Sequence, residues 1–123
     1  MIVTVQQKSE QPQDVKKACD NVGVKHMWIP LEGANKPLLE NKTIQKRLKN
    51  DLLKLWEHLS NNQERVLIHC AAGIHRTGTT TYTLLRWNGS SPEESYSMLK
   101  GIREDTHRGV GDWRIALAEA NLV

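Results

Sequence analysis

The amino-acid sequence predicts an α/β fold, with a central, mostly parallel β-sheet flanked by helices. Short runs of β-branched and other apolar residues, which are typical of strands, recur along the chain. Segments whose apolar residues recur at helical spacing separate these runs. The chain has 123 residues, near the usual size of one domain, so we expect residues 1–123 to form a single domain. Strands that alternate with helices favour a parallel sheet, which binds ligands at the carboxyl ends of its strands.

The first part of the chain is predicted to form a strand, a helix and a second strand. Residues 1–5 are of strand type, and residues 24–29 form another apolar run that ends at Pro30. Between them, residues 14–21 are expected to form a short helix. The residues that would face inward from this helix are Val15, Ala18 and Cys19.

A loop and a long helix are expected next. Residues 30–42 contain proline, glycine and asparagine but few apolar residues, which indicates a loop. Thr43 is placed to cap the helix that follows. The apolar residues of that helix recur mostly at spacings of three and four, which predicts one buried face: Ile44, Leu48, Leu52, Leu55, Trp56 and Leu59.

Residues 65–69 form a short apolar run, of the kind expected of a central parallel strand that is buried on both faces. A helix over residues 76–87 is predicted to follow, and Gly89 would end it.

Two further helices are predicted near the carboxyl terminus. The first extends to about residue 103 and begins with an N-cap, an N1 proline and a capping-box acid: Ser91, Pro92 and Glu94. The second covers residues 113–121, and Asp112 is expected to cap it. Its residues available for packing are Ile115, Leu117 and Ala118.

Composition and charge are those of a globular protein, with 38% hydrophobic and 25% charged residues. The formal net charge of +3 fits an ordinary surface and also fits attraction to anionic substrates. Basic residues cluster in one stretch, where a solvated helix face is the simpler interpretation and a positive rim of the cleft is the alternative: Lys36, Lys42, Lys46, Arg47 and Lys49.

The sequence predicts a cytoplasmic protein, with the nucleus as the alternative compartment. It shows no signal peptide, no lipidation motif and no apolar run long enough to span a membrane. Two cysteines, Cys19 and Cys70, are too few for a disulfide framework in a domain of this size. Cys19 is expected to be a buried, small apolar residue; a reversible protective disulfide with Cys70 is the alternative.

The segment from His69 to Gly78 is the main candidate site. It places a cysteine directly after a strand and an arginine six residues later, at the start of a helix. Backbone N–H groups in such a turn converge on one point, and the helix adds its positive end there, which favours phosphate. Glycine in the middle of the turn accepts a positive φ and leaves room for the ligand. The predicted phosphate-binding residues are Ala71, Ala72, Gly73, Ile74, His75 and Arg76.

The same environment predicts a reactive Cys70. Hydrogen-bond donors, the helix end and Arg76 should lower the thiol pKa below that of a free cysteine, so that a thiolate attacks phosphorus and forms a phosphocysteine. Arg76 would bind two oxygens with its planar fork, and Thr77 would donate a hydrogen bond to the sulfur. The alternative is an inert buried cysteine. A rhodanese-like loop is less suitable, because Gly73 and Thr77 fit it poorly.

This motif, His69-Cys70-Ala71-Ala72-Gly73-Ile74-His75-Arg76-Thr77, resembles the His-Cys-x5-Arg-Ser/Thr signature of the protein tyrosine phosphatase superfamily. The order of elements around it is similar to that of the compact dual-specificity branch, here with a short N-terminus. The resemblance implies a parallel-centred sheet flanked by helices, no metal, no cofactor, and a carboxylic acid on a loop upstream of the cysteine.

Glu32 is the candidate for this general acid. It is the only carboxylate in the loop of residues 28–37, which has the family's order of an aromatic residue, a proline and then the acid. It departs from the family pattern because it is a glutamate and stands 38 positions before Cys70. Glu40 is a second candidate. The alternative is that the acid is absent, or is supplied by the substrate or by water.

His69 is expected to brace the loop by hydrogen bonding. His75 is expected at the rim of the site, where it contacts substrate or adds positive charge at low pH, and not as a catalyst. The five histidines show no metal-ligand spacing, so no metal is predicted.

Other large side chains receive structural interpretations. Trp56, Trp87 and Trp113 are at helical positions and are expected in the core. Arg103 and Arg108 are expected to be salt-bridged surface residues, with contact to the phosphate site as the alternative.

The predicted function is hydrolysis of phosphotyrosine, and also of phosphoserine and phosphothreonine, in proteins by a monomeric enzyme. An RNA 5′-triphosphatase is an alternative, although no aromatic-basic pattern for stacking bases favours nucleic acid. An inositol-lipid phosphatase is another, weakened because Ala71 and Ile74 stand where lipid-directed relatives often have lysines. A phosphate-binding module with little turnover is the alternative from a different class, and no membrane association is expected.

Overall fold

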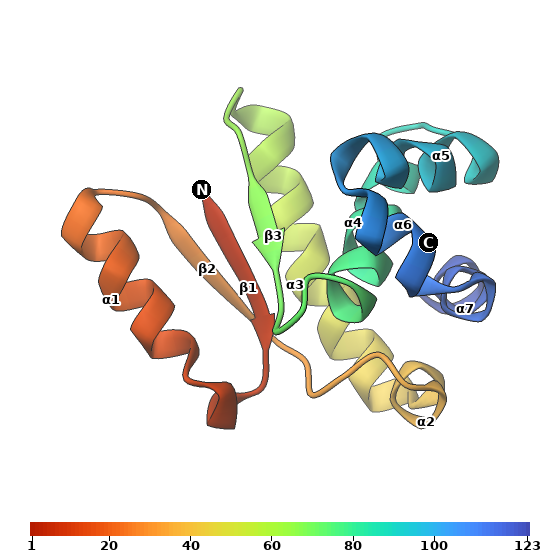
Figure 1. Ribbon diagram of the computed structural model, residues 1–123, viewed down its shortest axis with the longest axis horizontal. Helices are drawn as coiled ribbons and strands as arrows, with labels where there is room; N and C mark the ends of the chain where they lie inside the picture. Colours follow the sequence, from red (N-terminus) through yellow and green to blue (C-terminus); the bar gives the residue numbers. More distant parts are fainter.

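The computed structural model describes residues 1–123 as three parallel β-strands and seven α-helices (Figure 1). The strand order is β2-β1-β3, with bounds β1 (Ile2–Gln6), β2 (His26–Pro30) and β3 (Leu67–His69). Thr4 of the central strand pairs with Trp28 on one side and with His69 on the other. The predicted α/β fold with a parallel sheet flanked by helices is therefore confirmed.

The prediction that residues 65–69 form a central strand buried on both faces is wrong. β1 is the central strand, and β3 lies at the edge of the sheet, where the side chain of Leu67 is 57% exposed. A short apolar run has the composition of a buried strand, but it carries no information about which strands become its neighbours. The connections through the helices decide that order.

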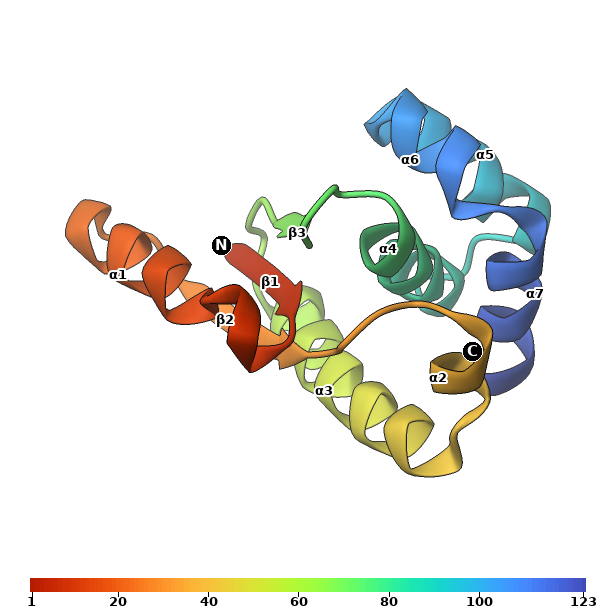
Figure 2. The same ribbon diagram turned by 60° about the horizontal axis from the view of Figure 1, so that its bottom comes forward.

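Helices cover both faces of the sheet (Figure 2). α1 (Pro12–Val22) crosses from β1 to β2 and contacts both strands, while α3 (Lys42–Asn61) crosses from β2 back to β3 on the other face. Parallel crossovers are right-handed, so a reversal in the direction of strand addition places successive helices on opposite faces. The carboxyl ends of all three strands therefore meet at one edge, which leads into the candidate site.

The core lies between the sheet and α3 and α4 (His75–Trp87). Leu48, Leu52 and Leu55 of α3 are almost fully buried, as their helical spacing predicts. Their core neighbours from the sheet and from α4 are Val3, Val5, Ile29 and Tyr82. Trp56 and Trp87 pack partly buried against this core, whereas Trp113 is 42% exposed and the prediction of a core position is wrong for it.

The predicted ends of the helices are partly correct. The capping box of α5 (Pro92–Ile102) is confirmed, because the Ser91 hydroxyl accepts from the Glu94 N–H and the Glu94 carboxylate accepts from the Ser91 N–H. Asn41, and not Thr43, caps α3: its side chain accepts from the N–H of Ile44. An asparagine two residues earlier satisfies the free N–H groups equally well, and local sequence does not rank the two residues.

Asp112 is the first residue of α7 (Asp112–Asn121) and not its cap; Gly111, with φ of 79°, occupies that position. Ala18, predicted to face inward from α1, is exposed, while Cys19 on the same helix is buried.

Three short helical segments were not expected from the sequence. They are η1 (Lys8–Glu10), α2 (Lys36–Glu40) within the predicted loop, and α6 (Glu104–Val110). Segments of three to seven residues are too short for a hydrophobic period to stand out. Two of them, η1 and α6, contribute residues to the candidate site.

A cavity of about 750 Å³ lies along β3, between this edge strand and helices α3, α4 and α5. Apolar side chains such as Trp56, Leu85 and Ile102 line it. Gly73 and Thr77 border it on the side of residues 70–74, which we call the phosphate loop after the ligand predicted for it. None of the helices combines the length and the apolar character that crossing a bilayer requires.

Replacement of Gly78 by alanine is expected to lower the free energy of unfolding by about 1–3 kcal/mol. A Cβ there would lie 2.7 Å from Cγ2 and 2.9 Å from Cβ of Val110, so α4 and α6 would have to separate. Chemical denaturation measures the effect. The matched control is Gly101→Ala in α5, where nothing lies within 4 Å and the better helix former should preserve or raise stability. Equal effects at both positions would contradict the packing argument.

Candidate active site

Cys70 lies directly after β3, and the chain then turns through a loop, Cys70–Ile74, into the first turn of α4. The thiol is largely buried, and the Thr77 hydroxyl donates to its Sγ at 3.1 Å. Burial alone would raise the pKa of the Cys70 thiol. Hydrogen bonds from the Thr77 hydroxyl and from the backbone of Thr77, Gly73 and Ile74 outweigh burial and hold that pKa below its usual value. Donors from the loop and the helix therefore converge on the sulfur.

Two side chains hold the loop, one from Arg103, which precedes α6, and one from Thr106 within α6. Nη1 of Arg103 donates to the carbonyl oxygens of Ala72 and Gly73 at 2.8 and 3.0 Å, and the Thr106 hydroxyl donates to the latter at 2.6 Å. Two features require glycine at position 73. Its φ is 71°, which other residues rarely adopt, and a Cβ would lie 2.5 Å from Arg103 Nη1. The carbonyls of Ala72 and Gly73 are therefore bonded to the Arg103 and Thr106 side chains, while the backbone of Gly73 and Ile74 donates towards Cys70.

The sequence interpretation of Arg103 as a surface residue is therefore incomplete. Its side chain is half-exposed and pairs with Asp105 at 3.6 Å, yet it also holds the loop. Arg108 matches the expectation, since it is exposed and pairs with Asp105 at 2.8 Å.

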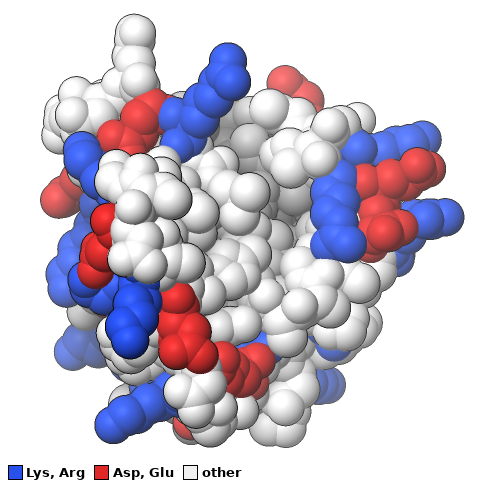
Figure 3. Space-filling model, turned by 60° about the vertical axis from the view of Figure 1, so that its left-hand side comes forward, with Lys and Arg blue, Asp and Glu red and all other residues white.

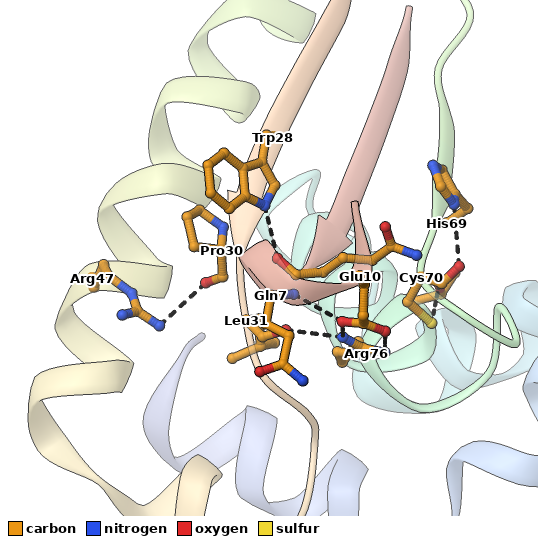
Figure 4. A network of polar contacts seen from close by, with 11 residues as sticks. Gln7, Glu10, Trp28, Pro30, Leu31, Arg47, His69, Cys70 and Arg76 are labelled. Carbon is orange, nitrogen blue, oxygen red and sulfur yellow. Dashed lines mark hydrogen bonds and ion pairs between the residues drawn. The ribbon is translucent and has the colours of Figure 1, made fainter. Parts of the chain in front are cut away.

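Arg76 is held by an ion pair that sequence analysis did not find. Its Nη1 and Nη2 atoms donate to the two carboxylate oxygens of Glu10 at 2.6 and 2.8 Å, and Nη1 also donates to the Leu31 carbonyl at 3.0 Å (Figure 4). The hydrogen bond with Arg76 lowers the pKa of Glu10, and the same bond raises that of Arg76. Glu10 stands just after the carboxyl end of β1, and this placement is the one sequence signal that could have pointed to it.

The geometry of this pair leaves one edge of the guanidinium free for a ligand. Of the five N–H groups of Arg76, the bonds to Glu10 and Leu31 use three. The remaining two, on Nε and Nη2, point in the same direction along one edge of the plane. Such an edge binds two oxygens of an oxyanion at once.

Glu32 lies beside the site but makes no hydrogen bond or ion pair. It is exposed and follows Leu31, whose carbonyl accepts from Arg76, so the loop that carries it borders the arginine. Glu40 is exposed in α2 and pairs with Lys36 at 3.8 Å, without contact to the phosphate loop. The role of Glu32 stays a prediction.

The two histidines of the motif have different surroundings. His69 contacts the Cys70 carbonyl through Nδ1 at 3.1 Å. His75, the first residue of α4, is exposed over much of its surface. The partial burial of its ring lowers its pKa, and the positive charges of Arg114 and Arg76 lower it further. Arg114 of α7 also donates from Nε to the Ala34 carbonyl at 2.7 Å, which ties the loop of Glu32 to α7.

Cys19 and most of the basic cluster lie away from the candidate site. Cys19 is buried in α1, and both cysteines are free. Of the basic cluster, Arg47 reaches the site region, where it donates to the Pro30 carbonyl at 3.2 Å. Figure 3 shows Lys and Arg side chains along the margins of one face, next to acidic side chains, with a mostly uncharged surface between them. Lys36, Lys42 and Lys46 are exposed and make no contact with the candidate site, which favours the interpretation of a solvated charged surface for the basic cluster.

Cys70 is expected to be alkylated by iodoacetamide at neutral pH, with a midpoint in the rate-against-pH curve below the ~8.5 of an ordinary thiol. Thr77→Val, which removes the hydroxyl bonded to Sγ, should raise that midpoint because the thiolate loses a donor. Cys19, only 3% exposed, should stay unreactive in the folded protein, and Cys19→Ser provides the control. A midpoint at or above that of a free thiol would contradict the lowered pKa.

Comparisons with known proteins agree with this geometry. The sequence model of the family described as dual specificity phosphatase, catalytic domain, matches residues 2–118. No curated protein matches the chain in sequence. One similar solved structure is the core catalytic domain of the PP-IP phosphatase SIW14 from S. cerevisiae in complex with citrate, at a TM-score of 0.63 and 20% identity. The match covers 98% of this chain but 66% of that one, and it concerns the fold. Because the family model spans nearly all of the sequence, the chain belongs to the dual specificity phosphatase catalytic-domain family.

Proposed function

We propose that residues 1–123 form a monomeric, single-domain phosphatase that hydrolyses phosphomonoesters in proteins, with phosphotyrosine as the main substrate and phosphoserine and phosphothreonine as further ones. One observation carries the proposal. Cys70, whose pKa is lowered, and Arg76, which has a free edge, stand at the two ends of one short segment, residues 70–76. A thiolate nucleophile and a fork for phosphate oxygens are the two groups that this chemistry needs.

In the proposed first step, the phosphate group lies among the N–H groups of Ala71, Ala72, Gly73, Ile74, His75 and Arg76. The Cys70 thiolate attacks phosphorus in line with the leaving oxygen. As the S–P bond forms, the P–O bond breaks and its electron pair goes to the leaving oxygen, which takes a proton from the Glu32 carboxyl. The Arg76 edge binds two equatorial oxygens throughout.

In the second step, water attacks phosphorus and gives a proton to the Glu32 carboxylate. The S–P bond breaks, and its electron pair returns to the sulfur of Cys70, where the hydrogen bond from Thr77 stabilises the thiolate. No metal or cofactor is needed in either step. Because hydrogen bonds hold Arg76 and the phosphate loop in position before the substrate binds, these groups need little rearrangement during the reaction.

Turnover of an aryl phosphate tests the nucleophile and the clamp. Cys70→Ser should abolish turnover, and Arg76→Lys should lower kcat about 10²- to 10³-fold, because lysine keeps the charge but lacks the fork. Glu10→Gln should also lower kcat, since the guanidinium loses its bidentate partner. Glu57→Gln, an exposed acid on α3, is the control and should match the wild type. Turnover that persists in Cys70→Ser would refute the proposal.

The dependence on the leaving group tests Glu32. Glu32→Gln should lower kcat/KM, which reports the first step, by ~10²- to 10⁴-fold on a phosphotyrosine peptide. The effect on kcat/KM should be smaller for p-nitrophenyl phosphate, whose leaving oxygen is a weak base and needs little protonation. Glu40→Gln is the matched control. Equal rates for Glu32→Gln and wild type on both substrates would show that another group, or none, donates the proton.

The fold shared with the PP-IP phosphatase SIW14 favours a second candidate, a phosphatase of inositol pyrophosphates. Phosphate release from matched concentrations of phosphotyrosine peptide, inositol pyrophosphate, inositol lipid and triphosphate-ended RNA separates the candidates by kcat/KM. The protein-phosphatase proposal expects the peptide to rank first. Tight binding of vanadate with negligible turnover of every substrate would instead favour a phosphate-binding module.

A further inference from the structure

Three polar side chains on one face of the sheet form a hydrogen-bonded row that ends at the phosphate loop. Oγ1 of Thr4 on the central strand lies 2.8 Å from Nε2 of His26 on β2 and 2.7 Å from Nε2 of His69 on β3. Nδ1 of His69 in turn lies 3.1 Å from the carbonyl oxygen of Cys70. Thr4 is fully buried, so its hydroxyl has only these two imidazoles as partners. The row crosses the whole width of the sheet.

The direction of each hydrogen bond in the row follows from the contact between Nδ1 of His69 and the Cys70 carbonyl oxygen. A carbonyl oxygen only accepts, so Nδ1 of His69 carries a proton and donates to Cys70. In a neutral imidazole Nε2 is then an acceptor, and the Thr4 hydroxyl donates to it. The Thr4 oxygen is left as an acceptor towards His26, whose Nε2 must carry a proton and donate. The resulting order runs from His26 through Thr4 and His69 to Cys70.

We infer that Thr4 and His26 are positioning residues for the candidate active site, which select the tautomer of His69 that holds the Cys70 carbonyl. The inference rests on the proposed function for its catalytic consequence. The Cys70 carbonyl and the Ala71 N–H belong to one planar trans peptide, so they point in opposite directions. Fixing the carbonyl therefore aims the first N–H of the phosphate loop.

The row also limits the charge on its two histidines. If both imidazoles were protonated, each Nε2 would be a donor towards Thr4, and the hydroxyl proton would have no acceptor on either side. The groups around His26 agree with this limit: burial lowers its pKa, the charges of His69 and Lys16 lower it further, and only Asp20 raises it. Protonation of His26 alone would add its proton at Nδ1 and leave Nε2 as a donor to Thr4, so the row would keep both of its hydrogen bonds.

The sign of the pH effect follows from the lowered pKa of His26. A histidine whose folded-state pKa lies below its unfolded value stabilises the fold above the ordinary pKa of ~6.5, and this contribution is lost as the pH falls through the folded value.

Thr4→Val tests the inference, because it keeps the β-branched shape and removes only the hydroxyl. We expect kcat for an aryl phosphate to fall about tenfold, as for the loss of one hydrogen bond that orients the nucleophile's loop, and the Cys70 alkylation midpoint to rise. Nitrogen NMR of His69 should show a mixture of tautomers instead of the Nδ1–H form. Thr4→Ser should restore all three properties, and Thr81→Val, at a threonine whose hydroxyl makes no side-chain hydrogen bond, is the control.

His26→Leu is the second variant, because His26 is partly exposed and its replacement should be tolerated if Thr4→Val fails to fold. It should shift the His69 tautomer in the same direction and should reduce the loss of stability between neutral and acidic pH. Wild-type tautomer signals and a wild-type alkylation curve in the folded variant would overturn the inference. Both measurements need no turnover, so a protein without phosphatase activity would refute the proposed function and leave this test intact.

Discussion

The arrangement of the candidate site depends on the ion pair between Arg76 and Glu10. These residues are 66 positions apart, one just after the carboxyl end of β1 and the other in the first turn of α4. Because the same guanidinium binds the Leu31 carbonyl, it joins the segment after β1, the loop after β2 and the helix that follows the phosphate loop. A largely buried guanidinium that lost its carboxylate would be costly, so the pair fixes both the plane of the arginine and the edge that these bonds leave free.

The surrounding structure holds the phosphate loop through its carbonyl oxygens. Its carbonyl oxygens accept hydrogen bonds from Arg103, which precedes α6, from Thr106 on α6 and from His69 on β3. Each bonded carbonyl holds its peptide plane, and the N–H of that plane faces the opposite way. Side chains from outside the loop thus orient the donors inside it, and the tight packing of α6 against Gly78 keeps them in place.

Sequence reasoning succeeded where the signal is local. The buried stripe of α3 and the capping box of α5 depend on residues three or four apart, and the structure has both. It failed where two nearby residues could cap the same helix, and where contacts between distant segments set the order of the strands. Asn41 displaced Thr43 as a cap, and β3 became an edge strand although its composition is that of a buried one. The short helix α6 left no periodic signal, yet it holds the phosphate loop.

The sequence by itself determined the family and the position of the cysteine loop, because the residues that form the loop are contiguous and their spacing sets its geometry. The hydrogen bonds that lower the pKa of the Cys70 thiol against the effect of burial also come from donors within this segment, Gly73, Ile74 and Thr77. Only the tertiary structure decided the partner of Arg76, the brace from α6 and the row from His26 through Thr4 to His69. Those contacts join residues from 22 to 66 positions apart, and a pattern of nearby residues contains no information about which distant side chains the fold will bring together.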